Sequence, residues 1–384
     1  MRLSSGLHLA YCGNVHRGET WEETLAALQS FTLAVRDRVS PGQPYGIGLR
    51  LSDNASRTLV DPSTLRAFGR WLDAHNCYVF TINGFPFGQF HGARVREQVF
   101  APDWSTPERL DYTNRLFNIL AALLPADVAG SVSTLPGSFK LFNRTPEQLD
   151  AIQENLWRCI EHTARLSARS GHDLHLGVEP EPFGLFENTQ ETLCFFSAMK
   201  DRRPNDTRLA QHLGINYDTC HFALQYEEPA KALNAFRSHG IRISKIHLSS
   251  ALRTVPDATA REMLRAFSDD TYLHQVVART MDGALLRYKD LPLALAQNEA
   301  ADEWRIHFHV PLYADPEGAL QTTADHVLGT LDWLAQTPDA CAHLEMETYT
   351  WEVLPSPFKT ASVVDQLTRE YEWVLPKLAA RNLV

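Results

Sequence analysis

The sequence predicts an α/β protein that folds as a single (β/α)8 barrel, the TIM barrel, with a long insertion after strand seven. Three observations predict this fold. Short β-type runs recur along the chain, most of them precede a segment with helical spacing, and ionisable side chains repeatedly stand at or just past the ends of the runs in the second half. Strands that alternate with helices indicate a parallel sheet, and eight repeats favour closure into a barrel over an open doubly wound sheet.

The predicted strands are short apolar runs bounded by polar or turn-forming residues. In chain order they fall near residues 7–12, 46–51, 77–83, 129–134, 174–179, 213–218, 243–248 and 342–348. Runs of this length and composition are typical of the buried strands of a parallel sheet. The sequence contains no G-x-G-x-x-G or P-loop motif that would support a nucleotide-binding sheet instead.

Capping residues mark the starts of several predicted helices. Thr20 opens a capping box before the first helix, and Asp61-Pro62 places a cap and a proline at the start of another. Thr145 repeats this pattern before a long amphipathic run, which Gly171 ends ahead of the fifth strand. The apolar spacing over 363–375 predicts a last helix that packs against the outside of the barrel.

Two segments of the sequence are longer than the connections of a (β/α)8 barrel need to be. The loop after the third strand is rich in aromatic residues and glycine over 84–91, and we expect it to form a wall of the pocket. The segment 251–313 contains a predicted β-hairpin over 275–288. We interpret it as a loop and hairpin excursion over the barrel mouth that returns His307 and His309 to the mouth, because long ordered loops are usually functional.

Composition limits the class of protein. The chain has 384 residues, of which 44% are hydrophobic, a formal net charge of −10 and a pI near 5.9. This charge argues against a broadly basic nucleic-acid or membrane surface, and no stretch approaches the ~18 uninterrupted apolar residues of a membrane-spanning helix. The first apolar run lacks the long core of a signal peptide, and the six cysteines are scattered without a C-x-x-C pair. We therefore expect a soluble, cytoplasmic protein with one domain over 1–384.

The candidate site lies at the ends of the last four predicted strands. Glu179, Asp218, His247 and Glu347 stand at or just past the ends of strands five, six, seven and eight. In a β/α barrel the carboxyl ends of the strands carry the active site. Carboxylates combined with imidazole form a mixed oxygen and nitrogen site that suits Mn²⁺, Mg²⁺, Co²⁺, Fe²⁺ or Zn²⁺, without selecting among them.

Each candidate also has a plain structural explanation. A strand-end carboxylate can cap the next helix, and a single histidine is more often a satisfied structural group than a ligand. Glu345 lies on the same strand face as Glu347, so it is either a rival ligand or a supporting partner. We favour Glu347 because it is nearer the strand end. Four aromatic residues could stack on a sugar ring or pack between loops and helices: Phe85, Phe87, Phe90 and Trp104.

Several motifs resemble the xylose-isomerase-like barrels. Glu179-Pro180-Glu181-Pro182 is similar to the strand-five Glu-Pro-Lys-Pro of the isomerases, with glutamate in place of lysine. Asp218-Thr219-Cys220-His221 resembles the Asp-x-x-His of epimerases and endonuclease IV. His247 and Glu347-Thr348 match the ligands of strands seven and eight. This superfamily includes ketose 3-epimerases, sugar-phosphate isomerases, inosose dehydratases and endonuclease IV. The resemblance implies that Glu179, Asp218, His247 and Glu347 bind one divalent metal ion.

The resemblance also implies a reaction on a small polyhydroxylated substrate, which would be a sugar, a sugar phosphate or a cyclitol. Glu179 and Glu347 would remove and return a proton through a metal-stabilised enediolate, as in an isomerase or epimerase. Substrate hydroxyls would be held by His221, Arg253, Glu181 and His309. The expected partner is this small molecule, with no nucleic acid and no membrane insertion, and a homo-oligomer is allowed.

Two other functions stay open at this point. A second metal held by His221, His307 and His309 would favour a metal-dependent hydrolase of the endonuclease IV type. The opening segment 8–19, the 83–86 loop and the His307-x-His309-x-Pro311 motif resemble the EboE family of metabolite traffic proteins. That resemblance implies a role in a specialised-metabolite pathway, either as an enzyme or as a non-catalytic barrel that binds a metabolite.

Overall fold

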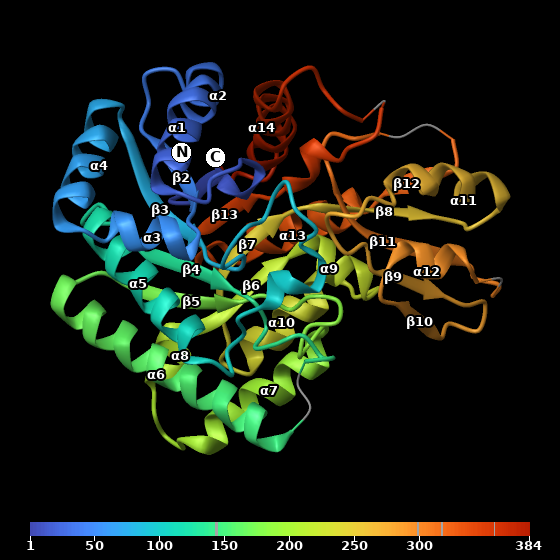
Figure 1. Cartoon of the computed structure of the whole chain (residues 1–384), viewed down its shortest axis with the longest axis horizontal. Helices are drawn as coiled ribbons and strands as arrows, with labels where there is room; N and C mark the ends of the chain where they lie inside the picture. Colours follow the sequence, from blue (N-terminus) through green and yellow to red (C-terminus); the bar gives the residue numbers. More distant parts are fainter. Residues whose placement is uncertain (143–144, 298, 316–317, 357) are drawn as a thin grey trace.

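The computed structural model describes residues 1–142, 145–297, 299–315, 318–356 and 358–384. Its main sheet has eight strands in the order β1-β13-β7-β6-β5-β4-β3-β2, and every strand pair in it is parallel. A parallel bridge between Cys12 and Gly48 joins the two outer strands. The sheet is therefore a nearly closed barrel with alternating helices, and the predicted fold is confirmed (Figure 1).

All eight predicted barrel strands are present. They are β1 (His8–Tyr11), β2 (Tyr45–Arg50), β3 (Cys77–Asn83), β4 (Gly130–Thr134), β5 (Leu174–Val178), β6 (Leu213–Asp218), β7 (Arg242–Leu248) and β13 (His343–Met346). Nearly every residue in these strands is buried, because both faces of a parallel barrel sheet are covered. The barrel strands therefore hold the chain's main hydrophobic core together with the outer helices.

Helices surround the barrel. They are α1 (Trp21–Ala27), α2 (Leu33–Val39), α3 (Asp53–Leu59), α4 (Pro62–Ala74), α5 (Pro107–Leu123), α6 (Pro146–Ser170), α7 (Thr189–Arg202), α8 (Arg208–His212), α9 (Thr219–Leu224), α10 (Pro229–Ser238), α13 (Ala324–Gln336) and α14 (Val363–Ala379). A π-helical segment, Leu28–Thr32, joins α1 to α2, and short 3₁₀ segments occur at Gly13–Val15, Arg96–Phe100, Arg265–Phe267, Pro338–Ala340 and Tyr349–Glu352. Within the described residues, no helix is long and apolar enough to cross a membrane.

The predicted helix caps are confirmed. Thr20 and Thr145 each accept a backbone N–H in a reciprocal capping box. Asp61 caps α4, whose first residue is Pro62. Gly171 ends α6 in a left-handed conformation with φ of 78°, which glycine adopts without steric cost.

The insertion after β7 is a second sheet. Its elements are β8 (Ser250–Thr254), α11 (Ala258–Leu264), β9 (Val276–Arg279), β10 (Leu285–Tyr288), α12 (Leu291–Leu295), β11 (Glu303–Val310) and β12 (Leu320–Thr322). The strands pair antiparallel in the order β10-β9-β11-β8-β12. The predicted hairpin is the β9–β10 pair, and the insertion brings His307 and His309 to the pocket as predicted. Strands between 250 and 322 join into one five-stranded sheet, so this sheet extends beyond the predicted 251–313 segment.

This second sheet has its own apolar cluster, which includes Leu252, Phe267, Trp304, Ile306 and Phe308. It lies beside the barrel at the right of Figure 1. The division of the chain into domains stays a prediction.

The loop between β3 and α5 meets the insertion. The backbone N–H groups of Val95 and Arg96 both donate to the carbonyl oxygen of Thr271, at 2.9 and 3.0 Å. The Tyr272 hydroxyl lies 2.7 Å from His91 Nδ1, and Arg96 forms an ion pair with Asp290. These contacts tie the loop to the insertion beside the pocket that both of them line.

Candidate active site

Four predicted ligands come together at the carboxyl ends of neighbouring strands. Glu179 follows β5, Asp218 ends β6, His247 lies near the end of β7, and Glu347 follows β13. One ligating atom from each side chain lies within 4.8 Å of those of the other three, and all four residues are buried. His247 Nδ1 is 3.3 Å from Glu179 Oε1, 3.6 Å from Asp218 Oδ2 and 3.1 Å from Glu347 Oε2.

The two oxygens of Asp218 have different surroundings. Oδ1 accepts hydrogen bonds from the backbone N–H groups of Cys220 and His221 and from the Ser249 hydroxyl, at 2.7, 3.1 and 2.6 Å. Oδ2 has no hydrogen-bond donor among the described residues although it is buried. A buried carboxylate oxygen without a donor is costly, and a cation would satisfy it. The donor set therefore fits a divalent ion of the kind that the sequence predicts.

His247 carries the positive charge at the centre of these carboxylates. Burial alone would lower its pKa, but Glu347, Glu179 and Asp218 outweigh that effect and raise the pKa of His247 well above its usual range. Burial also opposes ionisation of Asp218, yet His221 and His247 hold its pKa well below the usual range. Because a histidine binds a metal ion only through an unprotonated ring nitrogen, a cation bound here would replace the proton on His247 Nδ1.

Glu345 lies beneath the site. Its Oε2 accepts hydrogen bonds from Lys245 Nζ at 2.6 Å and is 2.8 Å from His247 Nε2. Burial raises the pKa of Glu345, but Lys245 and His247 outweigh burial and lower it to about 2. Glu345 therefore orients the imidazole from below, whereas Glu347 lines the pocket. Glu345 could have been a rival metal ligand or a partner that supports the ligands, and its contacts favour the second role.

Three asparagines orient the two glutamates. Asn14 and Asn83 donate to Glu347 Oε1 at 2.8 and 3.1 Å, and Asn216 donates to Glu179 Oε2 at 2.8 Å. The other oxygen of each glutamate faces His247. Sequence reasoning assigned no role to Asn83, Asn216 or the buried Lys245. The available signal was periodicity, since Asn216 and Lys245 each precede a predicted ligand by two residues on the same strand face.

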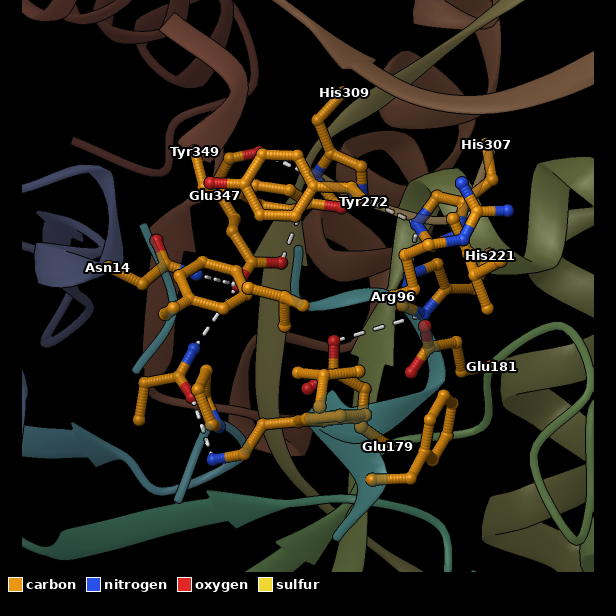
Figure 2. Close-up of a pocket in the computed structure, with 18 of the residues that line it drawn as sticks. Asn14, Arg96, Glu179, Glu181, His221, Tyr272, His307, His309, Glu347 and Tyr349 are labelled. Atoms are coloured by element: carbon orange, nitrogen blue, oxygen red, sulfur yellow. Dashed lines mark hydrogen bonds and ion pairs between the residues drawn. The ribbon is translucent and has the colours of Figure 1, made fainter. Parts of the chain in front are cut away.

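A pocket of about 560 Å³, including its open mouth, lies above these groups (Figure 2). Its polar lining includes Glu181, His221, His307 and His309 together with Glu179 and Glu347. Phe85 and Phe90 line it as well, whereas Phe87 packs on Tyr112 and Trp104 donates to Thr134. Tyr272 and Tyr349 extend the aromatic wall.

Arg253 is not among the described residues that line this pocket. It lies on β8, and its Nη1 donates to Asp325 Oδ2 at 2.9 Å. The expected contact of Arg253 with substrate is therefore not supported, because β8 pairs within the second sheet instead of continuing the loop at the barrel mouth. The arginine that lines the pocket is Arg96, from the β3–α5 loop (Figure 2).

Burial sets the protonation of the other polar groups. It raises the pKa of Glu181 well above the usual range, and the nearby Glu179 and Glu347 carboxylates add to that effect. Burial also lowers the pKa of His221, and it lowers that of His307 well below the usual range. Burial therefore favours the protonated form of Glu181, which can donate a hydrogen bond, and the neutral forms of His221 and His307.

No protein-family model matches the sequence, and no curated protein matches it significantly. Solved structures match the fold over nearly the whole chain. The xylose isomerase domain protein from Planctomyces limnophilus is 14% identical with a TM-score of 0.52, and the match covers 99% of this chain and 98% of that chain. The probable 3-DHS dehydratase AsbF from Bacillus anthracis is 15% identical with a TM-score of 0.50, over 96% of this chain and 99% of that chain.

A D-tagatose 3-epimerase-like protein is 13% identical with a TM-score of 0.50, over 98% of each chain. At these identities the similarity shows the fold. The chain therefore has the fold of the xylose-isomerase-like barrels, as its motifs predict, and the narrower likeness to the EboE family stays a prediction.

Proposed function

We propose that this protein is a divalent-metal-dependent isomerase or epimerase of a small polyhydroxylated compound, such as a sugar, a sugar phosphate or a cyclitol. The observation that carries the proposal is the pair of buried glutamates, Glu179 and Glu347. They enter the pocket from β5 and from the end of β13, and β6 and β7 separate these strands in the sheet. A carboxylate on each side of a bound substrate allows one to accept a proton and the other to return it.

The metal would be held by Glu179, Asp218, His247 and Glu347. When bound, a divalent ion at this site supplies Lewis-acid polarisation of a substrate oxygen. The mixed oxygen and nitrogen donors suit Mn²⁺, Mg²⁺, Co²⁺, Fe²⁺ or Zn²⁺.

The chain's own residues hold the two glutamates in place. Asn14 and Asn83 fix one oxygen of Glu347, and Asn216 fixes one oxygen of Glu179. The remaining oxygen of each carboxylate is thereby directed to the centre of the site. Such fixed positions allow proton transfer at a carbon next to a carbonyl group without reorganisation of the side chains.

The remaining lining residues would orient and enclose the substrate. Protonated Glu181 can donate a hydrogen bond to a hydroxyl group, and His221 and His309 line the same pocket, where they can hydrogen-bond to a neighbouring hydroxyl. The aromatic wall around Phe90 and Tyr272 would exclude water from the reacting carbon.

The test is deuterium incorporation from D₂O into a panel of ketoses, sugar phosphates and oxidised cyclitols, after the protein has been loaded with Mn²⁺ or Zn²⁺. We expect one substrate class to acquire deuterium at the carbon next to its carbonyl group. Glu347→Gln should bind that compound and exchange it about 10²- to 10⁴-fold more slowly. The control is Glu352→Gln, since Glu352 lies on the neighbouring segment but forms an ion pair with Arg17.

Equal exchange rates in the wild-type protein and Glu347→Gln would contradict the acid–base role. Binding without exchange in either protein would instead favour a barrel that only binds a metabolite.

A further inference from the structure

His91 is a buried histidine that joins three separate segments of the chain beside the pocket. It lies in the loop between β3 and α5, and it is not among the described residues that line the pocket. His91 Nε2 lies 2.6 Å from the backbone carbonyl oxygen of Asn14, and His91 Nδ1 lies 2.7 Å from the Tyr272 hydroxyl. Asn14 belongs to the 3₁₀ segment Gly13–Val15 and Tyr272 to the insertion, so both ring nitrogens bond to segments outside the loop.

The two partners assign the hydrogens on this ring. A carbonyl oxygen can only accept a hydrogen bond, so His91 Nε2 carries a hydrogen and donates it to Asn14. Burial lowers the pKa of His91, which favours the neutral ring. A neutral ring has one N–H, so Nδ1 accepts and the Tyr272 hydroxyl donates to it. The Tyr272 ring packs against Phe90 and Tyr349, with centroids 5.3 and 5.1 Å away, so His91 fixes the hydroxyl end of a side chain in the aromatic wall.

The contact with Asn14 continues to one of the two pocket glutamates. Asn14 Nδ2 donates to Glu347 Oε1 at 2.8 Å (Figure 2). A carboxylate oxygen accepts, so the amide nitrogen of Asn14 and not its Oδ1 must face Glu347. His91 holds the main chain of the same asparagine. Asn14 is therefore held at its carbonyl group, and a shift of its main chain would move the amide donor away from Glu347.

We propose that His91 is a positioning residue for Glu347. Through Tyr272 and Asn14 it couples the placement of the insertion to the orientation of this glutamate. The inference rests on the proposed function for the acid–base role of Glu347, whereas the contacts that carry it do not depend on any reaction.

The expected effect of His91 is on the rate of proton transfer. Misplacement of a reacting group by about 1 Å costs about 10²-fold in rate. Asn83 also donates to Glu347 Oε1, at 3.1 Å, and it comes from β3, so loss of His91 leaves one of the two donors in place. Loss of His91 should therefore lower kcat less than Glu347→Gln does. Since His91 does not line the pocket, KM should stay nearly unchanged.

The first experiment measures deuterium exchange with the compound that the D₂O panel identifies. We expect His91→Leu to lower kcat about 10- to 100-fold and to change KM less than about threefold. His91→Gln should recover most of kcat, because its amide offers both a donor and an acceptor. His326→Leu is the matched control. It also removes a buried histidine that contacts a tyrosine hydroxyl, that of Tyr217 at 2.9 Å, but it lies on α13, away from the described pocket lining, so kcat should not change.

The second experiment needs no turnover. Crystal structures of the wild-type protein and His91→Leu compare the distance between Asn14 Nδ2 and Glu347 Oε1, which we expect to exceed hydrogen-bonding range in the variant. The ¹⁵N NMR signals of the histidine rings should show the hydrogen of His91 on Nε2. In Tyr272→Phe the Nδ1 signal should shift while Nε2 keeps its hydrogen.

An unchanged distance in His91→Leu, or a hydrogen on Nδ1 of neutral His91, would overturn the inference and leave the proposed function standing. A rise in KM with unchanged kcat would also overturn it, because that result would show a role in binding. A longer distance without exchange in the wild-type protein would support the positioning of Glu347 and contradict the proposed function. If His91→Leu does not fold, Tyr272→Phe replaces it, with an expected loss of about 3- to 10-fold in kcat. An unchanged kcat in that variant would contradict the coupling to the insertion.

Discussion

The carboxylate-rich group and the histidine group are neighbours, but different parts of the molecule build them. Glu179, Asp218, His247 and Glu347 all stand at strand ends of one parallel barrel sheet. The histidine group instead combines His221, from the barrel helix α9, with two side chains from β11 of the second sheet. The first group depends on strand register within one sheet, whereas the second depends on how the insertion packs against the barrel.

Register explains why the first group is compact. Asp218 pairs with His247, and His247 pairs with Glu345, so these three residues lie at one level of the barrel. Glu347 lies two residues further along and therefore reaches the pocket above them. Among the described strands the histidine group has no such common ladder, and the contacts that place it include His309 Nδ1 with the Glu347 carbonyl and the Thr350 hydroxyl with the His309 carbonyl. The comparison predicts that the two groups respond to different substitutions.

The largest expected change in stability follows removal of the buried Lys245 ammonium group below the carboxylate-rich group. Lys245→Met leaves Glu345 without its ammonium partner, and breaking a buried ion pair in this way costs about 3–5 kcal/mol of unfolding free energy. We expect urea unfolding to show this loss, and metal titration to show weaker binding at the carboxylate-rich group. Lys231→Met on α10 is the control, since Lys231 is exposed. A similar loss in both variants would show that the buried pair has no special role.

A second expected effect is a pH dependence of stability, and it arises where the barrel and the second sheet meet. Glu370 of α14 accepts hydrogen bonds from the Thr348 hydroxyl, beside Glu347, at 2.6 Å and from the backbone N–H of Leu312, just after β11, at 3.2 Å. Burial raises the pKa of Glu370 from its ordinary value of 4.5 to about 7. Between these pH values the folded protein keeps a proton that the unfolded chain releases.

The contribution of Glu370 to the free energy of unfolding therefore falls as the pH rises from about 4.5 to about 7, by about 3 kcal/mol in total. Glu370→Gln should remove this slope, because the amide does not titrate. Urea unfolding at several pH values measures it. An identical pH dependence in the wild-type protein and the variant would mean that Glu370 is already ionised in the folded state at low pH.

A smaller effect concerns the amide that supports Glu179. Asn216→Ala removes the donor to Glu179 Oε2 and should weaken binding of a divalent ion at the carboxylate-rich group by about 10- to 100-fold. Calorimetric titration with Zn²⁺ measures this affinity. Asn155→Ala is a suitable control because this buried asparagine donates to the Trp104 carbonyl, outside the site. Equal weakening in both variants would show that Asn216 has no specific role at the site.

The smallest expected effect concerns the contact between loop and insertion. Arg96 and Asp290 form a largely buried ion pair that joins the β3–α5 loop to α12. A double-mutant cycle with Arg96→Ala and Asp290→Ala should give a coupling energy of about 1 kcal/mol in unfolding experiments. Limited proteolysis should cut the insertion faster in Arg96→Ala. Proteolysis at the wild-type rate would mean that the insertion is held by its apolar contacts alone.

Much of the barrel could be predicted from the chain. The ends of each predicted strand lie within two residues of those observed, and the caps at Thr20, Asp61 and Thr145 are observed. These features depend on local periodicity and capping, which neighbouring residues encode. The second sheet was harder to predict from the sequence, because β11 pairs with both β8 and β9 and forms a hairpin with neither of them. Only the local β9–β10 hairpin was predicted.

The sequence by itself determined the alternation of strands and helices and the acidic or imidazole side chains at the strand ends, since a barrel topology brings all such ends to one mouth. The tertiary structure decided that Glu347 lines the pocket while Glu345 supports His247, and that Arg96 lies there instead of Arg253. It also decided that His307 meets His221, 86 residues away in the chain. Such contacts depend on the packing of one sheet against another, which no local pattern of residues specifies.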